Sequence, residues 1–184
     1  MPRIKSLSPD QADNSAQPFL AAVSKQMGTI PNIFATMAHA PAVLEGFMGF
    51  SGALGKGKLD PVLREQIALV VAGYNGCDYC ASAHTALGLS AGLSKQEILQ
   101  NLVGTSSDQK TADVLSFVRL LMRDRGRVRD SEIEHLRAHR LTDEELIEIV
   151  AHVAVNTFTN YFNHLAETEI DFPVIKTEGV SRAA

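Results

Sequence analysis

The segment at residues 65–84, EQIALVVAGYNGCDYCASAH, constrains the fold of this chain more than any other stretch. Cys77, Cys80 and His84 are separated by three and four residues, and on a helix these steps place all three side chains on one face. Glu65 lies twelve residues before Cys77, which on a straight helix is a separation of about 18 Å. A single straight helix would therefore keep Glu65 away from the thiols.

A break before the cysteines indicates how the chain returns Glu65 to them. Gly73, Asn75 and Gly76 interrupt the helical pattern, so we expect one helix to end there and a second helix to begin near the cysteines. An antiparallel pair of helices would bring Glu65 back toward the thiols. The same break places the cysteines in the first turn of the second helix, where free backbone N–H groups and the helix dipole favour a thiolate.

The remainder of the chain reads as helices separated by glycine and proline. No stretch shows convincing strand alternation, and the longest periodic run extends from Thr142 to about Thr168. We therefore predict an all-α, single-domain helical bundle of about seven to nine helices. Three pairs predict helix starts: an Asp–Pro cap and two capping boxes, namely Asp60–Pro61, Ser94–Glu97 and Thr142–Glu145.

The ends of the chain and its charge limit its location and partners. We expect residues 1–170 to form the domain and residues 171–184 a C-terminal arm or flexible tail. The N-terminus lacks the apolar core of a signal peptide, and no apolar run approaches the ~20 residues of a membrane span. The net charge of −4 offers no basic field for nucleic acid. We expect a cytoplasmic protein without nucleic-acid or membrane partners, where a CxxC motif is more often redox-active or metal-binding than a permanent disulfide.

The spacing of the site residues resembles the signature of a known family. Glu65, eleven intervening residues, the motif Cys77-Asp78-Tyr79-Cys80, three residues and His84 resemble the AhpD-like alkylhydroperoxidase branch of the carboxymuconolactone decarboxylase family. GTIPNIFATMAHAPAVLEGF, LDPVLREQIALVVA and FNHLAETEIDFP extend the likeness to peroxidase-related members over most of the chain. The resemblance implies an AhpD-like bundle, a cofactor-free site and a homo-oligomer, commonly a trimer, dimer or hexamer.

The same resemblance implies a role for each site residue. Cys80 would be the nucleophile, Cys77 the resolving thiol, and His84 and Glu65 members of a proton relay. A thiolate that attacks a peroxide becomes a sulfenic acid, and a thiol one helical turn away can condense with it. Tyr79 departs from the best-known members, which carry histidine there; a phenol titrates near pH 10 and is a poor base at neutral pH. Tyr79 stays a candidate catalytic residue, with the proton path and substrate left open.

We therefore expect a thiol peroxidase or disulfide oxidoreductase, without a cofactor or metal, that reduces hydroperoxides or a partner disulfide through Cys77 and Cys80. Each turnover requires an electron donor to reopen the disulfide, which implies a dithiol partner such as a lipoyl or thioredoxin-type protein.

Three alternatives stay open. A lyase of the decarboxylase branch would use Glu65 and His84 as acid and base. A redox-sensing module would use the cysteines without turnover. A zinc-binding module would use Cys77, Cys80 and His84 as ligands, but a closed structural site needs a fourth. Further histidines are candidates by residue type alone, namely His39, His135, His139 and His152.

A weaker pattern lies eighty residues after the first. Glu145, Asn160 and His164 repeat the spacing of Glu65, Cys80 and His84. We favour helix packing and capping for these residues over a degenerate repeat in which Asn160 or His164 lines the same pocket.

Overall fold

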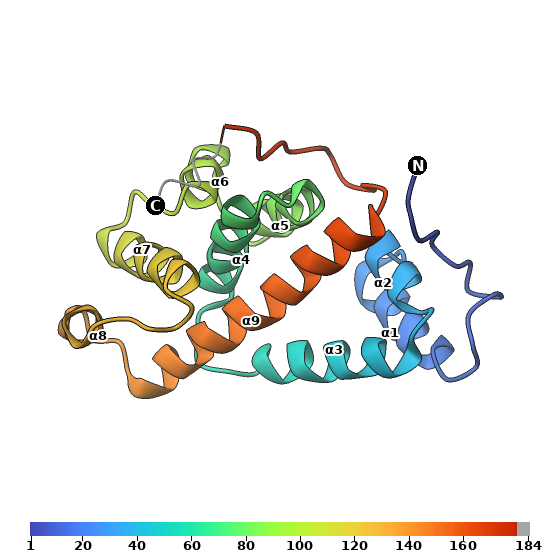
Figure 1. Cartoon of the computed structure of the whole chain (residues 1–184), viewed down its shortest axis with the longest axis horizontal. Helices are drawn as coiled ribbons and strands as arrows, with labels where there is room; N and C mark the ends of the chain where they lie inside the picture. Colours follow the sequence, from blue (N-terminus) through green and yellow to red (C-terminus); the bar gives the residue numbers. More distant parts are fainter. Residues whose placement is uncertain (180–184) are drawn as a thin grey trace.

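The computed structural model describes residues 1–179, which fold into nine α-helices and no strand (Figure 1). The all-α prediction is confirmed. The helices are α1 (Gln17–Met27), α2 (Asn32–Met37), α3 (Pro41–Leu54), α4 (Pro61–Asn75), α5 (Asp78–Ser90), α6 (Lys95–Leu102), α7 (Gln109–Arg123), α8 (Asp130–Ala138) and α9 (Asp143–Ala166).

The central helix is α4, which packs against α5, α6, α7 and α9. All residues from 66 to 73 are buried, which explains the apolar run that begins directly after Gln66. Leu69 and Ala72 join one apolar cluster with the cysteines, whereas Ile67, Val70 and Val71 join a second cluster with α7, α8 and α9. Because α4 contributes to both clusters, it fixes the site relative to the rest of the bundle.

The turn between α4 and α5 confirms the predicted break. The α4 helix ends at Asn75, and Gly76 adopts a left-handed conformation with φ of 72°, which strains any residue with a Cβ. The Cys77 N–H then donates to the carbonyl of Ala72 at 2.9 Å. This turn reverses the chain, so that α5 runs back along α4 and His84 comes to lie beside Glu65.

The capping predictions are confirmed at two helices and half wrong at the third. Asp60 accepts a hydrogen bond from the Val62 N–H at 2.8 Å, and Thr142 and Glu145 form a complete capping box. Ser94 caps α6, but the Glu97 side chain does not return to the Ser94 N–H. Its carboxylate instead accepts hydrogen bonds from the loop after α6 and from neighbouring amides, namely Ser106, Ser107, Asn101 and Gln66.

These contacts predict an acid-sensitive contribution of Glu97 to stability. Burial alone raises a carboxyl pKa, but the bonds from Ser106, Ser107 and Asn101 outweigh it and lower the pKa of Glu97 to about 2. The folded pKa lies below the unfolded pKa, so this stabilisation is complete above about pH 5 and disappears as the pH falls toward 2. We expect Glu97→Gln to lower the free energy of unfolding by about 1–2 kcal/mol near neutral pH.

Urea unfolding near neutral pH and near pH 3 measures this contribution, with Glu45→Gln on the exposed surface of α3 as control. The difference between Glu97→Gln and the unchanged protein should shrink at the acidic pH. An equal difference at both values would contradict the charge-based explanation.

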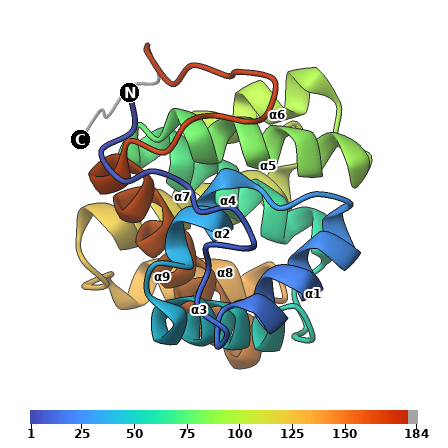
Figure 2. The same ribbon diagram turned by 90° about the vertical axis from the view of Figure 1, so that its right-hand side faces the viewer.

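The C-terminal arm crosses the start of α5 (Figure 1). The Ile175 N–H donates to the Ser82 hydroxyl at 2.9 Å, and the Thr177 N–H donates to the Asp78 carboxylate at 2.8 Å. Figure 2 shows the N-terminal segment beside the end of α9, where the Arg3 N–H donates to the Ala166 carbonyl. The boundary at residue 170 stays a prediction, and residues 180–184 of the predicted arm lie outside the described residues.

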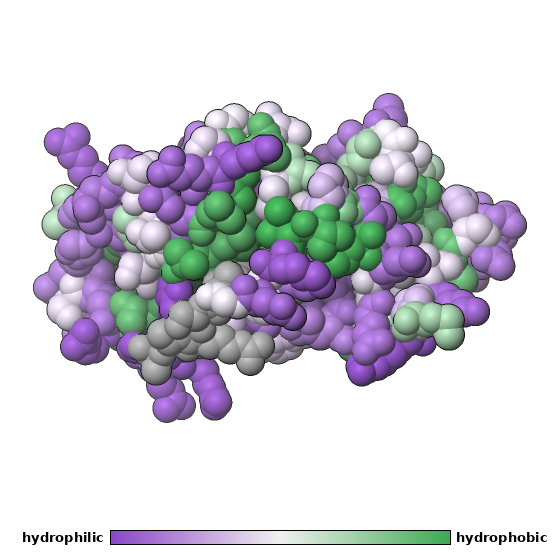
Figure 3. Space-filling model, turned by 90° about the horizontal axis from the view of Figure 1, so that it is seen from above, coloured by the Kyte–Doolittle hydropathy of each residue, from purple (hydrophilic) through white to green (hydrophobic). Residues whose placement is uncertain are grey.

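The surface carries exposed apolar side chains on several helices. Figure 3 shows an apolar band on the face that carries the C-terminal arm, and a second exposed stripe follows α9 through Ile147, Val150, Phe158, Tyr161 and Leu165. The homo-oligomer would cover such surface, and it stays a prediction. Across residues 1–179, no helix has both the length and the hydropathy to cross a membrane.

Candidate active site

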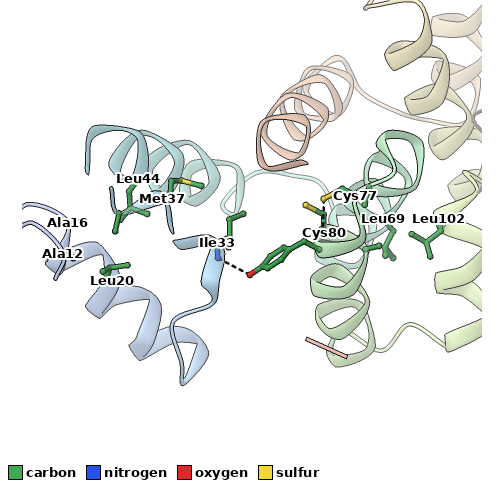
Figure 4. Close-up of a cluster of buried hydrophobic side chains, with 14 of the residues drawn as sticks. Ala12, Ala16, Leu20, Ile33, Met37, Leu44, Leu69, Cys77, Cys80 and Leu102 are labelled. Carbon is green, nitrogen blue, oxygen red and sulfur yellow. Dashed lines mark hydrogen bonds between the residues drawn. The ribbon is translucent and has the colours of Figure 1, made fainter. Parts of the chain in front are cut away.

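The two cysteines occupy the start of α5. Cys77 is the N-cap residue, and its sulfur accepts a hydrogen bond from the Cys80 N–H at 3.4 Å. Both are free thiols and nearly inaccessible, at 1% exposure for Cys77 and 3% for Cys80. Figure 4 shows them beside Leu69 at the edge of the buried cluster. The predicted first-turn placement is correct for Cys80, whereas Cys77 directly precedes the first turn as its N-cap.

A cavity of about 700 Å³ opens in front of Cys80. Cys80, His84 and Glu65 line it, and Cys77 is not among the described residues that do. Its walls are largely apolar and come from α1, α2, α3, α4, α5, α9 and the arm, including Phe34, Phe47, Met48, Leu87, Val155 and Phe172. A small molecule in this cavity would meet Cys80 first, with Cys77 behind it.

The surroundings of Cys80 stabilise its thiolate. A hydrogen bond from Cys77 lowers the pKa of Cys80, burial raises it, and the charge of His84 and hydrogen bonds from Asn163 and Thr159 lower it further, to about 7. The hydrogen bond to Cys80 and burial raise the pKa of Cys77. The proton shared by the two sulfurs therefore stays on Cys77, and the negative charge falls on Cys80.

His84 and Glu65 form an ion pair beside the thiols. The Nδ1 of His84 lies 2.8 Å from the Oε2 of Glu65, and each side chain is about one-fifth exposed. Burial lowers the pKa of His84, but the negative charge and hydrogen bond of Glu65 outweigh it, so the pKa of His84 is raised overall. The predicted meeting of Glu65, Cys80 and His84 at one site is confirmed, whereas their catalytic roles stay predictions.

The charge of His84 predicts a measurable shift in thiol reactivity. Because the charge of His84 lowers the pKa of Cys80, we expect His84→Gln to raise that pKa. A rise from about 7 to about 8 would lower the thiolate fraction near pH 7 roughly fivefold. The rate of Cys80 alkylation by iodoacetamide across pH measures this shift.

His39→Gln serves as the matched control, because His39 is exposed and bonds the Lys5 carbonyl. An unchanged pH midpoint in His84→Gln would contradict the electrostatic role of His84.

Tyr79 is tied to the scaffold through its hydroxyl. This group donates to Asp171 at 2.8 Å and accepts from the Ile33 N–H at 3.2 Å, a bond drawn in Figure 4. Its ring meets Phe172 edge-on at 5.8 Å between centroids. Burial raises the pKa of Tyr79 well above its ordinary value, so the phenol stays neutral. The structure therefore favours an architectural role, which joins α5 to α2 and the arm.

Two residues near the sulfur were not predicted from the sequence. The Asn163 amide donates to the Cys80 sulfur at 3.3 Å, and the Thr159 hydroxyl, which donates to the Asn156 carbonyl at 2.9 Å, contributes to the lowered pKa of Cys80. Both lie on the buried face of α9. The sequence did contain a signal that could have found them. Polar residues recur at helical spacing along the buried face of α9, at His152, Asn156, Thr159 and Asn163.

The weaker pattern at Asn160 and His164 serves helix packing, which is the interpretation that the sequence favoured. The Asn160 side chain accepts a hydrogen bond from the Asn75 amide at 3.0 Å, and the Nε2 of His164 lies 3.3 Å from the Gly76 carbonyl. Neither Asn160 nor His164 is among the described residues that line the cavity. Both support the turn that precedes Cys77.

Polar atoms of two lining residues lack protein partners. Within the described residues, the Nε2 of His152 and the Nε of Arg64 are buried and accept or donate no hydrogen bond. Burial and the nearby Arg64 charge lower the pKa of His152, which favours a neutral imidazole. Both atoms are thus unpaired polar groups that neighbouring atoms cover, in residues that line the cavity.

The thiols do not converge with His84 as metal ligands. Histidine, cysteine and acidic side chains can together hold a metal ion where at least three of their ligand atoms lie close to one another. Among residues 1–179, such a group, with all ligand atoms within 4.8 Å of one another, lies away from the cysteines, on α7 and at the end of α8. A zinc site at the cysteines would therefore require the thiols and His84 to move.

Residues 41–122 match the sequence profile of the carboxymuconolactone decarboxylase family. This range includes Glu65, both cysteines and His84 within the α4–α5 hairpin. This part of the chain is therefore similar to the carboxymuconolactone decarboxylase family. No curated protein sequence matches the chain.

Solved structures show that the AhpD-like fold extends over most of the chain. The alkylhydroperoxidase AhpD core of an uncharacterized peroxidase-related protein from Ralstonia eutropha JMP134 has a TM-score of 0.84 and 24% identity, over 92% of each chain. A peroxidase-related protein from Silicibacter sp. TM1040 has a TM-score of 0.79 and 22% identity, over 90% of this chain and 91% of that one. The debrominase Bmp8 has a TM-score of 0.75 and 21% identity, over 91% of each chain.

Proposed function

We propose that this protein is a thiol oxidoreductase that reduces a small, largely apolar hydroperoxide in the cavity. The observation that carries the proposal is the asymmetry of the cysteines. Cys80 lines the cavity and has a pKa of about 7, whereas Cys77 lies behind it and retains its proton. A thiolate at the cavity and a protonated thiol next to it are the two groups that a two-thiol cycle requires.

The proposed steps balance in atoms and electrons. The Cys80 thiolate attacks the terminal peroxide oxygen, the O–O bond breaks, and the leaving alkoxide takes a proton to become an alcohol. Cys80 is then a sulfenic acid. The Cys77 sulfur attacks the Cys80 sulfur, and the hydroxyl leaves as water with the Cys77 proton. The sum is one hydroperoxide and two thiols converted to one alcohol, one water and one disulfide.

His84 and Glu65 are the residues proposed to move the first proton. A protonated His84 stabilises the thiolate before attack and can give its proton to the alkoxide, while Glu65 holds the ring in place at 2.8 Å. Reopening the disulfide then requires a dithiol donor, and we propose a lipoyl or thioredoxin-type protein.

A second candidate is reductive dehalogenation by the same thiol pair. One solved structure of the debrominase Bmp8, a variant with alanine in place of a cysteine, holds 2,3,4-tribromopyrrole. The aromatic walls of the cavity suit a small halogenated ring in this chain as well. The electron count is the same, because an aryl bromide and two thiols give the dehalogenated ring, hydrogen bromide and one disulfide.

The deciding experiment supplies the reduced protein with cumene hydroperoxide, hydrogen peroxide or a bromopyrrole, each with dithiothreitol as donor. We expect catalytic loss of cumene hydroperoxide and reversible loss of both free thiols when the donor is omitted. Turnover of the bromopyrrole alone would replace the first proposal with the second. Thiol loss without turnover of any substrate would favour a redox sensor, and turnover of a carboxylic acid that survives thiol alkylation would favour a lyase.

A further inference from the structure

A cluster of possible metal ligands on α7 and α8 has no part in the proposed cycle. Asp113 lies in α7, His135 lies in α8, and His139 caps the end of α8 four residues later. We propose that these three residues bind a divalent transition metal, with zinc as the best fit, and thereby join α7 to α8. The two imidazoles reach the same carboxylate oxygen from one helix end.

The distances between the ligand atoms fit a zinc ion. The Oδ2 of Asp113 lies 3.1 Å from the Nδ1 of His139 and 3.4 Å from the Nε2 of His135. In a tetrahedral site with bonds of about 2.0–2.1 Å, neighbouring ligand atoms are about 3.3 Å apart. All three ligand atoms lie within 4.8 Å of one another, and rotation of the exposed His135 ring would bring the two ring nitrogens to the distance that a shared zinc ion requires.

The Oδ2 of Asp113 is buried without a hydrogen bond. Within the described residues it has no hydrogen-bond partner of acceptable geometry, although two ring nitrogens lie at hydrogen-bond distance. The rings therefore face this oxygen without an N–H aimed at it. A cation between the three atoms would satisfy the carboxylate and use the lone pairs of both imidazoles.

A hydrogen bond orients the Asp113 carboxylate, and both histidines are accessible from solvent. The Oδ1 of Asp113 accepts a hydrogen bond from the Gln109 amide at 2.9 Å, which fixes the carboxylate for binding through Oδ2. The side chains of His135 and His139 are 56% and 33% exposed, so an ion can enter from solvent. Two imidazoles and one carboxylate select zinc, nickel or copper over magnesium or calcium, and leave a position for water.

Calorimetric titration of the untagged, reduced protein with zinc chloride tests the site. We expect one zinc per chain, with affinity reduced at least about tenfold in His135→Gln and in His139→Gln. His39→Gln, an exposed histidine on a different part of the surface, is the matched control and should bind as the unchanged protein does. At about 100-fold excess over the dissociation constant, zinc should raise the Tm by roughly 5–10 °C.

Cobalt separates this site from the cysteines. A cobalt ion held by two imidazoles and a carboxylate lacks the near-ultraviolet charge-transfer band that thiolate ligands produce. Stoichiometric cobalt binding without that band, and lost in His135→Gln, supports the proposal. A thiolate band, unchanged affinity in both histidine variants, or no stoichiometric binding would overturn it.

Discussion

Cys80→Ser is expected to reduce the rate of hydroperoxide consumption with a dithiol donor by at least about 10³-fold. The reason is that Cys80 lines the cavity and carries the thiolate, and a serine hydroxyl is a far weaker nucleophile at the same position. The loss of cumene hydroperoxide per minute, followed with dithiothreitol in excess, measures this effect. The near isosteric change keeps the fold, which circular dichroism can check.

Cys77→Ser is the matched control, since it alters the neighbouring thiol of the same motif. It should still react once, and dimedone should then trap the sulfenic acid on Cys80. Its steady turnover should be lower than in the unchanged protein, because no second thiol in the site can release water from that acid. If Cys77→Ser lost the first reaction and Cys80→Ser kept it, the two cysteines would have exchanged roles.

Leu69→Ala is expected to lower the free energy of unfolding by about 2–5 kcal/mol. Leu69 is completely buried in the middle of α4, in the same cluster as both cysteines and Leu102 (Figure 4). Truncation removes apolar burial and leaves a cavity that the surrounding helices can only partly fill. Urea unfolding followed by circular dichroism measures the loss.

Leu99→Ala provides the comparison, because Leu99 on α6 is 61% exposed and should change the free energy of unfolding by less than about 0.5 kcal/mol. A loss below about 1 kcal/mol for Leu69→Ala would mean that the core around the thiols collapses to fill the gap. That outcome would contradict the close packing on which the geometry of the site depends.

Local signals explain which parts of the fold were predictable. The glycines before Cys77 predicted the α4–α5 turn because a left-handed φ of 72° at Gly76 is a property of that residue and its neighbours. The Asp60 cap and the Thr142 box likewise depend on side chains within three residues of the bonds that they form. Signals of this kind act over one turn of a helix and can be read without knowledge of the tertiary packing.

The partners of the site could not be predicted in the same way. Asn163 reaches Cys80 from 83 residues along the chain, and Tyr79 meets Asp171 across 92. Periodicity indicates which face of a helix is buried but not which helix it contacts. Glu97 shows the same limit, since its bonds to a later loop replaced the local capping bond to Ser94.

The hydrogen bond from the Cys80 N–H to the Cys77 sulfur links the oxidation state of the pair to the backbone. In the dithiol state the Cys77 sulfur is the acceptor that begins α5. Once it is bonded to the Cys80 sulfur, it must rotate toward its new partner and becomes a poorer acceptor. The arm donates hydrogen bonds to Asp78 and Ser82 at the start of α5. The conformation of this first turn would then differ between the dithiol and the disulfide state. In the proposed cycle, a dithiol reductant would therefore meet a differently shaped first turn of α5 on the oxidised protein.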